Sequence, residues 1–244
     1  MNVRTLRKIH RYLGLFVGVQ LLLWTASGLF FSLNSIAKVR GETEASEASP
    51  LRLTSPPASP APALAELAER QPGIEVRSVT LRPHLGEGIY EIAYDDGHRG
   101  RWALADARTG RLRSPLTEAE AVELARADFV PDAPVAGVTL ITEVDPGAEY
   151  RDRPLPAYRV SFDHPSGARI YVSTDRGVVT ARRNDRWRWF DLFWMLHVMD
   201  YEDRDDFNTW WLQLAAALGV ITILSGFTVA ALTSPRLRRL LDRR

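Results

Sequence analysis

Two long stretches without a charged residue or a histidine constrain this chain more than any other feature of its sequence. They cover residues 12–37 and 207–235 of the 244. In a helix, about 20 apolar residues at about 1.5 Å each span the hydrocarbon core of a bilayer. Chain-wide averages hide this pattern, because 45% hydrophobic residues is an ordinary value for a soluble domain. The sequence therefore predicts a membrane protein with transmembrane helices at 12–37 and 207–235.

The first stretch has a second interpretation as a cleaved signal peptide. Ser35, Ile36 and Ala37 fit a cleavage site with small residues at its first and third positions. The apolar part of a signal peptide is normally about 7–15 residues long, and this stretch is much longer. We therefore expect it to remain as a span, and the second stretch anchors the protein in either case.

Charge is distributed unevenly along the chain, although its net value is only +1. The basic N-terminus 1–11 and the basic tail 236–244 each carry +4, whereas the segment 38–206 carries −7. Basic flanks stay in the cytoplasm, and long polar domains are translocated regardless of charge. We therefore expect both termini in the cytoplasm and 38–206 on the other side of the membrane. The small net charge argues against nucleic-acid binding, and the absence of cysteine excludes disulfides, iron–sulfur clusters and thiolate metal sites.

The translocated segment begins with a Pro-rich linker at 38–64 and continues as two similar halves, 65–115 and 116–185. Residues that match at a constant offset of 68 are Tyr90 and Tyr158, Tyr94 and Phe162, Asp95 and Asp163, and Arg101 and Arg169. In each half a helical run precedes stretches of alternating apolar and polar residues, the period of a half-buried strand. The prediction is an α+β region with a helix and an antiparallel hairpin in each half.

Two further local features belong to this region. Thr117 and Glu120 have the spacing of a capping box at the start of the second helix. The histidines His84, His98 and His164 lie in polar, turn-like contexts, so we expect them on the surface.

The segment 186–206 joins the repeats to the second span and combines aromatic with acidic residues. Five of the seven tryptophans lie between residues 187 and 211, a density typical of the membrane interface. The acidic residues are Asp200, Glu202, Asp203, Asp205 and Asp206. Carboxylates are hard oxygen ligands that suit Fe³⁺ and divalent metals, so we predict that these residues bind a metal. A solvated negative turn is the alternative.

His10 lies at the start of the first span and is the first candidate haem ligand. Gly14 and Gly18 follow at i+4 and i+8, on the same face of the helix. Glycines beside a histidine leave the flat space that a porphyrin with an axial imidazole requires. Two alternatives stay open, since GxxxG is also a helix-packing motif and a histidine among basic residues can contact lipid phosphate.

His197 lies in an apolar, aromatic stretch near the other membrane face and is the second candidate ligand. Asp200 at i+3 can orient its ring, although a purely structural His–Asp pair is the alternative. One haem cannot bridge His10 and His197 within one chain, because they lie on opposite faces. A two-fold homodimer places the same residue of both copies at the same depth, so paired His10 and paired His197 residues could each hold a haem.

Each span also contains a Ser-Gly pair, within residues 26–29 and 224–227. Small residues in membrane helices allow close approach of neighbouring helices. We interpret both pairs as helix-packing motifs.

Three features together resemble the PepSY-associated transmembrane family. They are the opening KIHRYLGLFVG, the helix-plus-hairpin repeats that end in D-x-x-x-G-like turns, and WMLHVMDYEDRDDFN before the second span. The resemblance covers nearly the whole chain apart from the Pro-rich linker. It implies a bacterial inner-membrane protein whose PepSY region, within 38–206, lies in the periplasm, in a group linked to iron acquisition. Some similar members look like haem-containing reductases of ferric iron or ferric siderophores, and His10 and His197 match the family's membrane histidines. Larger members have four spans, so this two-span form requires a homodimer.

The sequence thus leads to a functional hypothesis and two rivals. The hypothesis is a haem b protein that transfers electrons outward and reduces ferric iron, free or chelated, in the periplasm. No flavin or nucleotide site is visible, so the electron donor is a quinol or a separate reductase. The first rival is a non-enzymatic, membrane-anchored PepSY module that binds or regulates an envelope protein such as a peptidase or a transporter. The second is an accessory subunit of an iron transporter.

Overall fold

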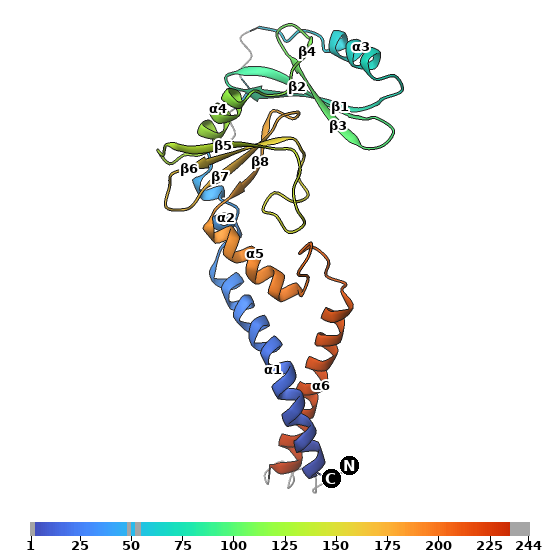
Figure 1. Cartoon of the computed structure of the whole chain (residues 1–244), viewed down its shortest axis with the longest axis vertical. Coiled ribbons are helices and arrows are strands. Elements are labelled where there is room, and N and C mark those ends of the chain that lie inside the picture. Colours follow the sequence, from blue (N-terminus) through green and yellow to red (C-terminus); the bar gives the residue numbers. More distant parts are fainter. Residues whose placement is uncertain (1–2, 48–49, 52–54, 235–244) are drawn as a thin grey trace. The chain divides into compact units, whose positions relative to one another are not determined.

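The structure, a computed structural model, describes residues 3–47, 50–51 and 55–234 (Figure 1). It divides into two compact units, one formed by residues up to Ser35 and from Trp189 onward, and the other by Ile36–Arg188. Helix α5, Asp185–Val198, begins in the second unit and ends in the first. The basic tail expected at 236–244 lies outside the described residues.

The first unit contains two long apolar helices, α1 (Val3–Leu33) and α6 (Trp210–Thr233), together with most of α5. The N-terminal part of α1 packs against the C-terminal part of α6, and the two helices diverge toward α5 (Figure 1). Both are long and apolar enough to cross a membrane. Large side chains point away from the pair, such as Phe16 at 79% exposure and Phe227 at 70%. α1 begins nine residues before the predicted span, because the basic residues that precede the apolar stretch are good helix formers.

The second unit begins with short elements that follow α1. These are α2, Ile36–Val39, and η1, Glu42–Glu44. Ala45 then forms an isolated β-bridge with Phe129, and the N–H of Ser46 donates to the C=O of Asp128 at 2.7 Å. The first part of the predicted linker is therefore attached to the second repeat.

Two similar repeats form the rest of this unit. The first contains α3 (Ala61–Arg70), β1 (Glu75–His84), β2 (Glu87–Asp95), β3 (Gly100–Asp106) and β4 (Leu112–Arg113). The second contains α4 (Glu118–Asp128), β5 (Val135–Ile141), β6 (Ala157–Phe162), β7 (Arg169–Ser173) and β8 (Val178–Arg183). The sheets are antiparallel, with the orders β1-β2-β3-β4 and β5-β6-β7-β8. The prediction of a repeated helix with antiparallel strands is confirmed, and each repeat has two strands more than the predicted hairpin.

The local predictions for the repeats are also borne out. Tyr90 and Tyr158, which match at the offset of 68, lie in the equivalent strands β2 and β6. Thr117 and Glu120 form the predicted capping box, with the Thr117 N–H donating to Glu120 Oε2 at 2.9 Å. This pair starts α4 at its expected position.

The prediction that all three repeat histidines lie on the surface is wrong for His84. This residue is only 7% exposed, and burial, followed by the positive charge of Arg113, lowers its pKa. The reason is packing between the repeats, since Ile89 and Leu104 of the first sheet share a core with residues of the second. A prediction that treats each repeat separately cannot include this burial. His98 is exposed as expected, and His164 is half-buried.

Candidate functional site

His10 of α1 faces α6 and forms a hydrogen bond with a serine of that helix. Its Nδ1 lies 2.8 Å from Oγ of Ser225. The same Oγ lies 2.8 Å from the C=O of Thr222. A serine hydroxyl has one proton, and when this proton is directed to the carbonyl, Oγ accepts the N–H of Nδ1. A neutral imidazole protonated at Nδ1 has a free electron pair on Nε2, the form in which histidine binds a metal.

Gly226, the next residue of α6, provides the space for the ring of His10. A Cβ atom at this position would lie 3.0 Å from Cε1 and 3.5 Å from Nε2 of the imidazole. Any side chain here would displace the ring. Ser225 therefore holds Nδ1, and Gly226 leaves room for the rest of the imidazole.

His197, in the last turn of α5, has the same arrangement with a serine of α1. Its Nδ1 lies 2.7 Å from Oγ of Ser27, and the same Oγ lies 2.7 Å from the C=O of Leu23. Ser27 is fully buried, so water does not compete for its oxygen. The indole of Trp24 donates to the C=O of His197 at 2.8 Å, and Phe31 packs edge-on against the ring. When the Ser27 proton is directed to its own helix, Nδ1 of His197 is the donor and Nε2 keeps its electron pair.

Asp200 does not orient His197, in contrast to the expectation from their spacing. α5 ends at Val198, and Met199 has a positive φ of 55°, so the chain leaves the helix before Asp200 reaches the i+3 position. Its carboxylate instead accepts hydrogen bonds from three N–H groups of the following loop, those of Glu202, Asp205 and Asp206, at 3.0–3.2 Å. The spacing argument fails because it assumes a helix that continues.

The other predicted metal ligands lie in the same loop between α5 and α6. Asp200 is 8% exposed; burial alone would raise its pKa, but the N–H donors of the loop outweigh burial and lower the pKa. The remaining acidic residues, Glu202, Asp203, Asp205 and Asp206, are exposed. Within the described part of the chain no group of three His, Asp or Glu residues is placed to hold a metal ion. Asp200 thus shapes the loop, and metal binding there stays a prediction.

The surface of α1 is open at three glycines. A Cβ atom at Gly14, Gly18 or Gly28 would meet no heavy atom within 4 Å, so these positions leave space of the kind that a porphyrin requires. His10 and Ser27 are 17 residues apart in α1, which corresponds to about 25 Å at about 1.5 Å per residue. One chain therefore presents one imidazole near each end of the spanning pair, and the two cannot share one iron.

The helices and repeats belong to a known group of proteins. Residues 7–243 match the family model of the PepSY-associated TM region. The chain belongs to this family. No curated protein and no solved structure matches it. Because the match includes both long helices and both repeats, the predicted family and the predicted fold class, a membrane protein with PepSY-like repeats, are confirmed.

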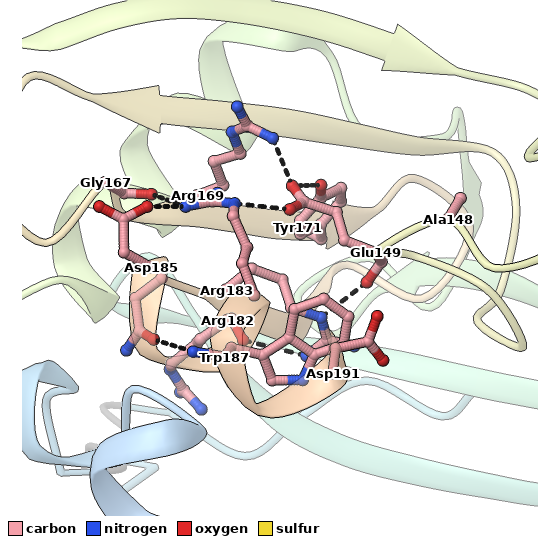
Figure 2. Close-up of polar contacts among 12 residues, drawn as sticks. Ala148, Glu149, Gly167, Arg169, Tyr171, Arg182, Arg183, Asp185, Trp187 and Asp191 are labelled. Atoms are coloured by element: carbon pink, nitrogen blue, oxygen red, sulfur yellow. Dashed lines mark hydrogen bonds and ion pairs between the residues drawn. The ribbon is translucent and has the colours of Figure 1, made fainter. Parts of the chain in front are cut away.

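This PepSY-associated protein also contains a half-buried carboxylate surrounded by arginines in its second unit (Figure 2). Glu149 accepts hydrogen bonds from Arg169 at 2.8 Å, from Arg188 at 3.1 Å and from the hydroxyl group of Tyr171. Arg183 donates to the C=O of Glu149 at 2.6 Å. Burial alone would raise the pKa of Glu149, but the three side-chain donors outweigh burial and lower the pKa. The network connects the loop before β6 with β7 and with the first turn of α5, which is a structural role.

The serines are the functional residues that sequence reasoning missed. Both Ser-Gly pairs were interpreted as packing motifs, whereas each serine holds the histidine near its own end of the helix pair. The sequence contains a signal for this pairing, because a hydroxyl group in lipid needs a partner within the protein and one histidine lies near each membrane face. The sequence pattern does not say, however, which serine meets which histidine.

Proposed function

We propose that this protein binds haem b between paired histidines of a homodimer and transfers electrons outward across the membrane to ferric iron, free or chelated. The observation that carries the proposal is the common environment of His10 and His197, since Nδ1 of each lies 2.7–2.8 Å from a serine Oγ. In the proposed state each Nδ1 donates to its serine, and the electron pair of Nε2 binds the metal. Bound haem supplies a one-electron carrier, while the chain supplies the ligand nitrogen, its orientation and apolar surroundings.

The dimer follows from the number of imidazoles. Each chain offers one imidazole near each face of the membrane, and a haem with two axial histidines needs two imidazoles near the same face. Two-fold symmetry brings His10 of both copies to one depth and His197 of both copies to the other. The open helix surface at Gly14 and Gly18 then provides clearance for the porphyrin beside His10.

The proposed orientation sets the direction of transfer. With the basic N-terminus in the cytoplasm of a bacterial inner membrane, His10 lies on the side of the donor and His197 on the side of the periplasmic repeats. The donor is a quinol or a separate reductase. The acidic loop at 200–206 then attracts ferric iron on the periplasmic side, where reduction supports iron uptake.

Absorbance spectra of the full-length protein, purified in detergent from cells with ample haem, test the proposal. We expect a Soret band that shifts on reduction with dithionite. His10→Ala and His197→Ala should each lose about half of the intensity of the band, because each variant removes the ligands of one of the two proposed haem sites. His98→Ala is the matched control, since His98 is exposed in a turn of the first repeat. Membranes that contain the protein should also reduce a ferric chelate, detected with a ferrous-specific dye.

Two results would contradict the proposal. One is colourless protein from haem-replete cells, which would favour the non-enzymatic PepSY module. The other is equal haem content in His10→Ala, His197→Ala and His98→Ala. In that case haem would bind elsewhere and the serine-held imidazoles would be structural.

A further inference from the structure

The second sheet ends in a strand with an unpaired edge. β5 pairs with β6 alone in the sheet order, and α4 packs against β6, β7 and β8 (Figure 1). Within the described residues the main chain of β5 forms no hydrogen bond beyond those of this pairing. Thr139 is exposed and Leu140 is 50% exposed. The free edge therefore presents N–H and C=O groups to which another strand can add.

β5 lacks the features that protect the edge strand of the first sheet. β1 contains Glu75, Arg77, Arg82 and Pro83. Its two arginines form ion pairs with acidic residues of β2. Charged side chains and proline discourage the addition of a strand. The seven residues of β5, VAGVTLI, include neither a charge nor a proline.

We infer that β5 pairs with β5 of a second copy and joins two four-stranded sheets into one antiparallel sheet of eight strands. An antiparallel pair of identical strands has two-fold symmetry, as a homodimer requires. Because β5 has no charge, the pairing opposes no like charges, whereas β1 paired with itself would. The inference rests on the proposed function in one respect: two copies that share a haem-binding helix bundle hold their β5 strands at high effective concentration.

Single cysteines test the pairing, because the chain has none of its own. Thr139→Cys places a thiol on the exposed side of β5, and Thr80→Cys places one on the exposed side of β1 as the matched control. We place the two-fold axis of the pair at Thr139, so that the two Thr139 residues lie opposite each other. Opposite residues of paired strands have Cβ atoms about 4.5–5.5 Å apart, close to the separation in a disulfide. In oxidised membranes that contain the full-length protein, we expect at least about ten-fold more disulfide-linked dimer from Thr139→Cys than from Thr80→Cys.

Leu140→Lys provides a second variant that should fold normally, because the side chain is half exposed. It gives β5 the kind of charge that protects β1, so the cross-linked fraction of Thr139→Cys should fall about five-fold or more in this background. Equal cross-linking of Thr139→Cys and Thr80→Cys would overturn the inference. Cross-linking that Leu140→Lys does not change, or that joins Thr139→Cys only to another protein, would do so as well.

Haem absorbance of the same samples separates the two proposals. Haem-containing protein without the Thr139→Cys cross-link contradicts only the pairing of β5. Cross-linked but colourless protein contradicts only the haem proposal.

Discussion

Replacing Ser225 with alanine is expected to loosen His10 while the fold of α6 is retained. The change removes the acceptor 2.8 Å from Nδ1 and leaves the helix backbone intact. A hydrogen bond between membrane helices contributes about 0.6 kcal/mol on average and up to about 1.7 kcal/mol, so the protein without haem should lose little stability. The effect on haem is larger, because loss of a partner that orients a ligating histidine typically costs 10–100-fold in metal affinity, or about 1.4–2.7 kcal/mol.

Ser32→Ala is the matched control for this prediction. Ser32 donates to the C=O of Leu29 at 2.8 Å, just as Ser225 donates to Thr222, but it is exposed and holds no histidine in the structure. Both variants are purified as full-length protein, and haem release to excess apomyoglobin is followed at the Soret band. Faster haem release from Ser225→Ala than from Ser32→Ala is expected. Equal rates would refute the reasoning that Ser225 fixes the tautomer of His10.

Three further results are expected. Gly226→Ala should reduce the haem content, since its Cβ would meet the ring of His10 at 3.0 Å, whereas Gly219→Ala, whose Cβ meets Leu21 at an ordinary 3.7 Å, should not. Glu149→Gln should lower the free energy of unfolding of the PepSY repeats by about 1–2 kcal/mol, because it removes the charge at the centre of a half-buried ion network that solvent partly screens. Glu143→Gln, at an exposed site, should have almost no effect in the same chemical denaturation. Because folding lowers the pKa of Glu149, its carboxylate stabilises the fold above the pKa of the unfolded state, and this stabilisation is lost as the pH falls through the pKa of the folded state. Between pH 6 and pH 3 the melting temperature should therefore fall less in Glu149→Gln than in the unaltered protein.

Much of the fold is legible in the sequence because it depends on local patterns. The spans follow from the length of the apolar stretches, and the strands follow from the alternation of residues. The start of α4 follows from Thr117 and Glu120, three residues apart. Even the duplication is visible, since Tyr90 and Tyr158 lie in equivalent strands. Each of these features needs information from only one segment.

The contacts that build the candidate site need information from distant segments. His10 and Ser225 are 215 residues apart in the sequence, and Ser27 and His197 are 170 apart. A helical pattern shows which face of a helix is apolar, but it does not show which polar groups of two helices meet. His84 illustrates the same limit, because its burial depends on how two repeats pack. The histidines could therefore be chosen from the sequence, and their partners could not.

The choice of serine rather than aspartate as the partner of each histidine suits a membrane. A carboxylate at the centre of a span would cost about 2.5–3.5 kcal/mol to insert. Ser27 and Ser225 avoid this cost because a serine is neutral. A serine that donates its proton to a carbonyl of its own helix, within reach at 2.7 Å for Ser27 and 2.8 Å for Ser225, can still accept from the histidine. Asp200, outside the long helices, is free to use its charge on the N–H groups of a loop instead.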